Sequence, residues 1–243
     1  MFRQLLQGIT RRIPSQCAVC HAWPAQAVCE ACVAEFAQPV FRCPTCALPL
    51  NGRMHPCGEC QRHPPPWDSC LAAVHYAYPW SRLMVEFKFR EQTAWATTFA
   101  TLMRATPWIE PALENADLLI PLPLSDQRLR ERGFNQTLLL ARALSPDKVD
   151  ARLLLRTRNT PAQHTLSRKD RLANMRLAFA VEPLRREALH GKRVVLLDDV
   201  MTSGATLRAA ADVLRQAGAS HLTTMVFART PSSEADPDPD WRE

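Results

Sequence analysis

The run from Arg193 to Thr206 constrains the fold of this chain more than any other segment. Its four apolar residues, Val194 to Leu197, are followed at once by Asp198 and Asp199. A short loop rich in hydroxyl groups comes next, and then a helix-forming stretch from Leu207 to Ala217. A strand without polar alternation is typical of a parallel sheet covered on both faces. Because ligands bind beyond the carboxyl ends of strands in open α/β sheets, this run predicts a ligand site at the two aspartates.

The residues after this strand suit a phosphorylated sugar. A carboxylate at Asp198 or Asp199 can accept hydrogen bonds from two neighbouring ribose hydroxyls. Thr202 to Thr206 offer hydroxyl and backbone N–H donors, and Gly204 lets the backbone approach a ligand closely. The positive end of the following helix favours an anion by about 0.3–1 kcal/mol when exposed. A Walker B strand would need an upstream G-x-x-x-x-G-K-[ST] segment, which the sequence lacks, and a receiver domain lacks such a loop. The alternative interpretation, in which no ligand binds and the segment is a buried strand followed by an ordinary capped helix, stays open.

Eight of the nine cysteines form four C-x-x-C pairs in the N-terminal part of the chain. The pairs are Cys17 with Cys20, Cys29 with Cys32, Cys43 with Cys46, and Cys57 with Cys60. Since zinc prefers four thiolates in a tetrahedron and each pair delivers two, the spacing predicts two structural zinc sites. We expect sequential pairing of neighbouring pairs, and a cross-brace is the alternative. One zinc with spare thiols, an iron–sulfur cluster and lost metal also stay open.

Charge and hydropathy narrow the class of protein. The formal net charge is +6, and the acidic segment 232–243 means that the rest of the chain is more basic still. A basic chain suits polyanions such as nucleic acid or a phosphorylated sugar, although it is weak evidence for either. The first ten residues suggest a short amphipathic helix rather than a signal peptide, and no segment is apolar enough to span a bilayer. We therefore expect a cytoplasmic protein with reduced cysteines.

Composition shifts divide the chain into three regions. We expect a double zinc ribbon over 1–66, an α/β domain over 67–231 after the proline run 64–66, and a disordered tail over 232–243. Patterns within the second region predict strands at 73–78, 117–124 and 220–228, and helices at 81–90, 93–103 and 137–144. They also predict a basic loop at 128–136 and a mobile flap at 156–174.

The run from Arg193 to Thr206 resembles the 5-phosphoribosyl-1-diphosphate (PRPP) signature of type I phosphoribosyltransferases. That resemblance implies the type I phosphoribosyltransferase fold, an α/β fold with a parallel sheet flanked by helices, beside the small zinc-ribbon domain. It implies that Asp198 and Asp199 hold the ribose hydroxyls and that the loop holds the 5′-phosphate. The PRPP-binding residues would be Asp198, Asp199, Met201, Thr202, Ser203, Gly204, Ala205, Thr206 and Arg128, with Mg²⁺ on the diphosphate.

Further motifs resemble the ComF family, the competence protein F group of phosphoribosyltransferase-like proteins. They are the R-G-F-N-Q segment 132–136, the block from Arg156 to Phe179, the segment around Lys88, and the cysteine pairs. The resemblance covers about Cys17 to Thr230. It implies catalytic roles for Asp198, Asp199, Arg132, Arg168 and Arg171.

The family resemblance implies a PRPP-binding protein linked to DNA uptake or the use of external DNA, with phosphoribosyltransferase chemistry and an unassigned acceptor. The alternative is a non-catalytic DNA-handling or partner-binding adaptor that keeps the PRPP pocket as a sensor. Candidate partners are PRPP, single-stranded DNA, DNA-uptake proteins and a second copy of the chain.

Overall fold

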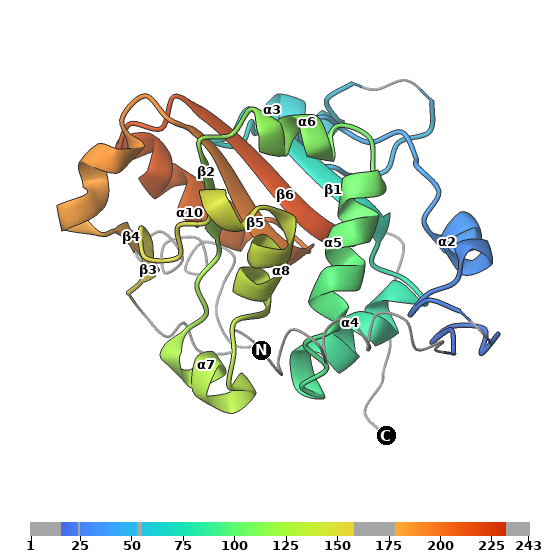
Figure 1. Ribbon diagram of the computed structural model, residues 1–243. Coiled ribbons are helices and arrows are strands. Elements are labelled where there is room, and N and C mark those ends of the chain that lie inside the picture. The colour runs from blue at the N-terminus through green and yellow to red at the C-terminus, as the bar shows by residue number, and fades with distance from the viewer. Residues whose placement is uncertain (1–15, 24, 53–54, 158–177, 232–243) are drawn as a thin grey trace, which may run out of the picture. The chain divides into compact units, whose positions relative to one another are not determined.

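The computed structural model describes residues 16–23, 25–52, 55–157 and 178–231 (Figure 1). The chain divides into two compact units, residues 1–38 and 39–243. The second unit contains the second half of the cysteine-rich region, and the domain boundary near residue 66 stays a prediction from the sequence. The predicted N-terminal helix, the acidic tail and nearly all of the predicted flap, including Arg168 and Arg171, lie outside the described residues.

Within residues 16–23 and 25–38 of the first unit, the structure shows one short helix, α2 (Glu30–Phe36), which begins directly after Cys29. The second unit is built on a four-stranded parallel sheet with the order β1-β6-β5-β2. Its strands are β1 (Ser69–His75), β2 (Leu118–Pro121), β5 (Arg193–Met201) and β6 (His221–Arg229). A separate antiparallel pair is formed by β3 (Leu154–Arg156) and β4 (Phe179–Val181).

Among the described helices of the second unit, the first precedes β1 and the others lie between the strands in the chain. They are α3 (Gly58–Arg62), α4 (Trp80–Phe89), α5 (Trp95–Ala105), α6 (Ile109–Glu114), α7 (Asp126–Arg132), α8 (Gln136–Leu144) and α10 (Ala205–Gln216). Short 3₁₀ helices cover Pro146–Lys148 and Pro183–Leu189. Among the described residues, none of the helices combines the length and the apolar character needed to cross a membrane.

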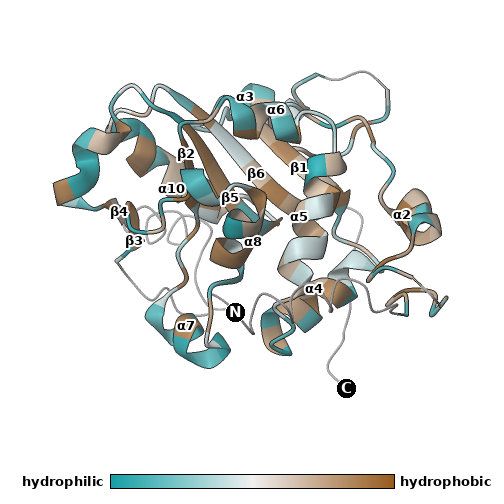
Figure 2. Cartoon of the chain, in the orientation of Figure 1, coloured by the Kyte–Doolittle hydropathy of each residue, from teal (hydrophilic) through white to brown (hydrophobic). Residues whose placement is uncertain are grey.

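Both faces of the sheet are covered, as the unbroken apolar strands predicted. On one face, Val194 and Leu196 of β5 share a buried core with Leu207 and Leu214 of α10. On the other, Phe227 of β6 stacks on Phe99 of α5 with ring centroids 4.1 Å apart. Successive residues of a strand point to opposite faces, so one apolar run fills both layers. Figure 2 shows this as brown strands beneath helices of mixed colour, whereas α7 is largely hydrophilic.

Two sequence expectations need correction. The segment 128–136 is not a basic loop, because residues 126–132 form helix α7. The Ser125 side chain caps that helix by accepting the Arg128 N–H, and Gly133 ends it with φ +73°. The first strand lies at 69–75 rather than 73–78, because pairing with β6 begins at Ser69 and runs to His75.

Candidate functional site

The two aspartates predicted as a ligand site lie near the end of β5 but have different surroundings. Asp198 is half-buried, and its Oδ1 accepts the backbone N–H of Asp199 at 2.8 Å. Burial and the charge of Asp199 raise the pKa of Asp198 from 3.8 to about 7, although Lys88 and that N–H act in the opposite direction. Asp198 can therefore exchange a proton close to neutral pH.

Asp199 is held by two side chains from separate helices. It is only 4% exposed, and its Oδ1 lies 2.8 Å from the Nζ of Lys88, near the end of α4. Its Oδ2 accepts a hydrogen bond of 2.7 Å from the Nε2 of Gln136, the first residue of α8. The Oε1 of Gln136 is buried and accepts no hydrogen bond within the described part of the chain. Asp199 is thus fixed by the protein, and Gln136 keeps an acceptor available.

The start of α8 is placed by its capping residue. The Oδ1 of Asn135 accepts the N–H groups of Thr137 and Leu138 at 2.9 and 3.2 Å, and its Nδ2 donates to the Leu122 carbonyl at 3.1 Å. Leu122 directly follows β2, so the cap ties the helix to the end of the neighbouring strand. The R-G-F-N-Q segment therefore builds the helix start that carries Gln136 to Asp199.

Arg132 and Arg156 interact electrostatically with the acid pair. Arg132 lies over the Phe89 ring with its Cζ 4.8 Å from the centroid. Burial lowers its pKa, and the charges of Asp199 and Asp198 oppose that shift. Arg156 behaves similarly: burial and the charge of Arg128 lower its pKa, and Asp198 raises it. One arginine of α7 and one of β3 thus interact with the charge of Asp198, whereas Arg168 and Arg171 lie outside the described residues.

The predicted phosphate loop joins β5 to α10. Thr202 and Ser203 are exposed, while Gly204 is buried and has φ +74°. The positive φ favours glycine here, and a Cβ at this position would lie 2.5 Å from the Cε of Met201, so the end of that side chain would have to shift. The loop therefore presents hydroxyl groups and the N-terminus of a twelve-residue helix.

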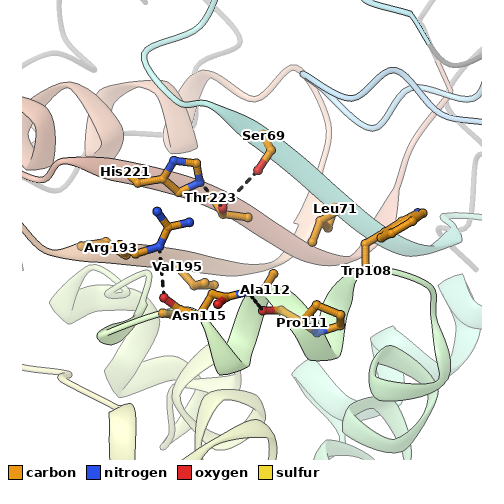
Figure 3. A pocket seen from close by; sticks show the side chains of 12 residues that line it. Ser69, Leu71, Trp108, Pro111, Ala112, Asn115, Arg193, Val195, His221 and Thr223 are labelled. Atoms are coloured by element: carbon orange, nitrogen blue, oxygen red, sulfur yellow. Dashed lines mark hydrogen bonds between the residues drawn. The ribbon is translucent and has the colours of Figure 1, made fainter.

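A hollow of about 270 Å³ lies elsewhere, at the amino ends of β1, β5 and β6 against α6 (Figure 3). Ser69, Thr223 and His221 line its strand side and are hydrogen-bonded in a row, Ser69 to Thr223 at 3.0 Å and Thr223 to His221 at 3.4 Å. Ligands of parallel sheets bind at the opposite strand ends, where Asp198 lies. We therefore assign this hollow no part in the site.

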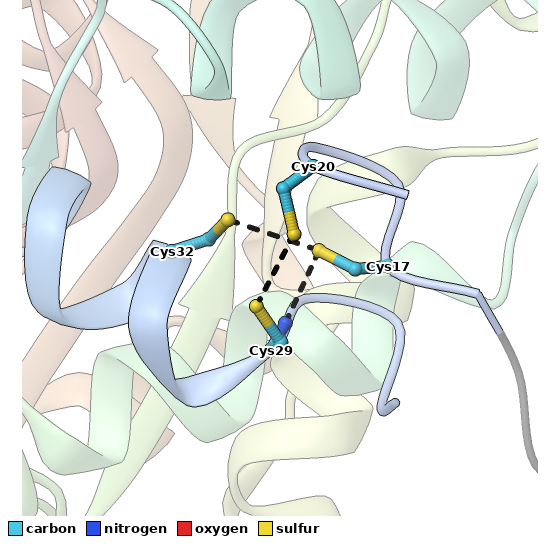
Figure 4. Close-up of side chains that lie close together, drawn as sticks. All are labelled: Cys17, Cys20, Cys29 and Cys32. Atoms are coloured by element: carbon cyan, nitrogen blue, oxygen red, sulfur yellow. Dashed lines mark hydrogen bonds between the residues drawn. The ribbon is translucent and has the colours of Figure 1, made fainter. Parts of the chain in front are cut away.

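The eight paired cysteines form two groups in the sequential order that the sequence predicted. One group is Cys17, Cys20, Cys29 and Cys32, and the other is Cys43, Cys46, Cys57 and Cys60. Within each group all four sulfur atoms lie within 4.8 Å of one another, so the cross-brace is excluded. Figure 4 shows the sulfur atoms of the first group turned toward a common centre.

The sulfur spacing fits a tetrahedral metal. A Zn–S bond of about 2.3 Å implies sulfur atoms about 3.8 Å apart. The observed separations include 3.6 Å for Cys20 to Cys29 and 3.7 Å for Cys46 to Cys57. Backbone N–H groups are directed at one sulfur of each group: Cys29 N lies 3.3 Å from Cys17 Sγ, and Cys57 N lies 3.3 Å from Cys43 Sγ. Such donors stabilise thiolates, and both groups are compatible with structural zinc.

Sequence reasoning left two residues out of the site. Lys88 and Gln136 lie inside motifs that it quoted, yet no spacing rule connects either with Asp199. The signal that could have found them is the rarity of an unpaired charge in a core. A lysine between two aromatic residues needs an anionic partner when it is buried. A polar residue at a helix start next to a buried strand end likewise needs a hydrogen-bond partner.

Comparison with known proteins agrees with this geometry. A family profile for the phosphoribosyl transferase domain matches residues 143–243. "DNA utilization protein YhgH" of Escherichia coli O6:H1 is 32% identical over 231 residues, covering 90% of this chain and 98% of that protein. "Competence protein F" of Haemophilus influenzae is 32% identical over 197 residues, with 77% and 84% covered. "Competence protein ComFC" of Bacillus subtilis is 30% identical over 220 residues, with 85% and 86% covered.

Among solved structures, the allosteric regulatory enzyme of purine biosynthesis matches 58% of this chain and 29% of its own at 18% identity, with a TM-score of 0.39. That similarity is too slight to add to the assignment, which follows from the relatives, the parallel sheet and the acid pair. The chain belongs to the ComF family and carries a phosphoribosyltransferase-type domain.

Proposed function

We propose that this chain binds PRPP at the carboxyl end of β5 and transfers its phosphoribosyl group. The observation that carries the proposal is the continuity of the acid pair, the glycine loop and the start of α10 in one segment of chain. Ribose hydroxyls would contact Asp198, and the 5′-phosphate would accept hydrogen bonds from the loop residues 202–206. The diphosphate would lie toward Arg128, Arg132 and Arg156, whose charges interact with one another or with the aspartates.

The two aspartates have separate roles in this arrangement. Asp199 is already neutralised by Lys88 and bonded by Gln136, so it serves to hold the edge of the site in place. Asp198 is the carboxyl group that remains available to stabilise positive charge on the sugar. When the bond from ribose C1 to the diphosphate oxygen lengthens, positive charge grows at C1, and an ionised Asp198 stabilises it. The arginines stabilise the negative charge that accumulates on the departing diphosphate.

Metals complete the proposal. The two cysteine groups would each hold a structural Zn²⁺, since four thiolates leave no open position for substrate. The PRPP oxygens and Asp198 offer the hard ligands that Mg²⁺ prefers, and Mg²⁺ would neutralise part of the diphosphate charge. A cytoplasmic location and self-association remain predictions that follow from the sequence alone.

Isothermal titration of the full chain with PRPP and Mg²⁺ tests the binding step. We expect one saturable site in the wild type and none in the double variant Asp198→Ala, Asp199→Ala. The single variant Asp198→Asn keeps the shape of the side chain and should also bind weakly. Asp147→Ala, which alters an exposed carboxylate outside the site, is the matched control. Unchanged affinity in the double variant would refute the site, and pyrophosphate release with a panel of nucleobases tests turnover.

A second candidate function is suggested by the names of the relatives, which refer to DNA utilization and competence. In that case the chain would bind PRPP without turnover and act as a DNA-handling adaptor. Single-stranded DNA binding with a steep salt dependence, together with no pyrophosphate release, would favour it. Pyrophosphate release with weak, salt-independent DNA binding would favour the transferase.

A further inference from the structure

The turn formed by Cys43 to Cys46 is bound to the sheet through three consecutive carbonyl groups. The Pro44 carbonyl accepts the backbone N–H of Cys70 at 2.9 Å. The Thr45 carbonyl accepts the indole N–H of Trp67 at 2.6 Å. The Cys46 carbonyl accepts the Nε–H of Arg229 at 3.0 Å. Hydrogen bonds therefore fix the second cysteine group to the start of β1 and to the end of β6. Because its acceptors are backbone carbonyls, the side chains of the cysteine turn do not reveal these bonds.

Each of the three donor residues also lies against Met201, the last residue of β5, or against the loop that follows it. Arg229 Nη1 donates to the carbonyls of Met201 at 3.1 Å and Thr202 at 2.6 Å. The Cη2 of Trp67 lies 3.8 Å from the place where a Cβ on Gly204 would be. The Cys70 thiol lies 3.8 Å from the Met201 sulfur. These donors therefore connect the cysteine turn to the end of β5 and to Thr202 and Gly204 of the following loop.

We propose that the second cysteine group braces the phosphate loop, and that Arg229 is the positioning residue that couples them. The proposal rests on the proposed function, because it takes residues 202–206 to bind the 5′-phosphate of PRPP. The planar guanidinium of Arg229 reaches the Cys46 carbonyl on one edge and the Met201 and Thr202 carbonyls on another. A rigid fork of this kind fixes the distance between two backbone segments.

Burial and charge support the same conclusion. Arg229 is 7% exposed, and no carboxylate forms an ion pair with it in the ranges that the structure describes. A buried cation without an anion is costly. Four thiolates around Zn²⁺ carry a net negative charge, which would offset the charge of the neighbouring guanidinium. The buried Arg229 therefore fits a metal-loaded cysteine group beside it.

The brace predicts a selective effect on ligands. Loss of the fork would let the Met201–Thr202 backbone drift, and the amides of the following loop would no longer converge on a phosphate. The arginines proposed for the diphosphate lie on α7 and β3, whereas Arg229 donates to the carbonyls of Cys46, Met201 and Thr202. The 5′-phosphate should therefore lose affinity while the diphosphate does not.

Titration calorimetry of the full chain with ribose 5-phosphate and with pyrophosphate tests this split. Arg229→Lys keeps the charge but cannot span both sets of carbonyls, so ribose 5-phosphate affinity should fall about tenfold, with pyrophosphate affinity within about twofold of wild type. Arg215→Lys is the matched control. Arg215 also donates to several carbonyls, those of Pro66, Ala219 and Ser220, but at the far end of α10. It should leave both affinities unchanged.

The possible results distinguish failure of the brace from failure of the proposed function. Wild-type protein that binds neither ligand would contradict the proposed function and not the brace as such. Wild-type binding with no change in Arg229→Lys, or equal losses for both ligands, would overturn the brace. If Arg229→Lys does not fold, Trp67→Phe provides a second test, because it removes both the hydrogen bond to the Thr45 carbonyl and the Cη2 atom that faces Gly204. A ribose 5-phosphate affinity equal to wild type in that variant would likewise overturn it.

Discussion

The two ends of the candidate PRPP site are held in place by different chemistry. At the acid end, charged and polar side chains from α4 and α8 fix Asp199, and burial sets the protonation of Asp198. At the loop end, Arg229 donates hydrogen bonds to the backbone carbonyls of residues 46, 201 and 202. Cys70 and Trp67 donate to the carbonyls of residues 44 and 45. The comparison teaches that one site can depend on pH at one end and on a metal-binding group at the other.

The largest effect should come from the loop end. Cys43→Ser removes a ligand from the second group, and structural zinc sites contribute about 10–16 kcal/mol of apparent binding free energy at neutral pH. We expect loss of one zinc per chain, a lower melting temperature and weaker PRPP binding. Zinc content, a thermal melt and calorimetry measure these three quantities.

Cys17→Ser is the control for that variant, since Cys17 lies in the first compact unit and has the same type of environment as Cys43. It should lose one zinc and keep its PRPP affinity. Equal losses of affinity in both variants would show that the second group has no special connection with the loop. An unaltered zinc count in Cys43→Ser would rule out the second metal site.

At the acid end, Lys88→Met should cost about 3–5 kcal/mol of unfolding free energy, because it leaves a buried carboxylate without its cation. Side-chain exposures of 17% for Lys88 and 5% for Asp199 place this pair in the core. Lys192→Met is the control: its Nζ lies 3.9 Å from a partly exposed Asp117, and such pairs contribute about 0–1 kcal/mol. Urea denaturation measures both, and similar losses would mean that the Lys88 pair is not buried in solution.

A smaller effect concerns pH and Asp198. Between its ordinary pKa of 3.8 and its folded pKa of about 7, this carboxyl holds a proton that the unfolded chain has released. The folded state then binds more protons, so this contribution to stability declines as pH rises through that window. Asp198→Asn should remove the decline. Unfolding free energies of both proteins from pH about 4 to about 8 test it, and identical slopes would contradict the raised pKa.

The smallest effect should be that of Trp67→Phe on stability. The variant removes one hydrogen bond to the Thr45 carbonyl and keeps an aromatic ring, so we expect a loss of about 1 kcal/mol. Trp108→Phe is the control, because the Trp108 side chain is mostly exposed. Equal stability of Trp67→Phe and wild type would show that the indole N–H finds water instead of Thr45.

Local patterns in the sequence predicted the parts of the site that lie in one segment. The strand with its two aspartates, the glycine loop and the order of the cysteine pairs all follow from spacing and residue type. Helix α7 could also have been predicted, since Ser125 and Gly133 are ordinary capping residues, but its arginines suggested a loop. The start of β1 could not be predicted, because the limits of this strand are set by its pairing with β6.

The contacts that hold the site together could not be predicted in this way. Gln136 and Asp199 are 63 residues apart, and their hydrogen bond depends on how α8 packs on the sheet. The boundary that we expected near residue 66 stays a prediction about folding, but the compact units divide after Gln38. The reason is that backbone carbonyls of the second cysteine turn bind Cys70, Trp67 and Arg229, and any sequence offers such carbonyls.

The most direct test of the whole account is an experimental structure of the chain with PRPP and Mg²⁺ at saturating concentration. We predict ribose hydroxyls within hydrogen-bond distance of Asp198 and the 5′-phosphate on the amides of residues 203–206. An ordered loop with no ligand, or a ligand bound away from the end of β5, would contradict it.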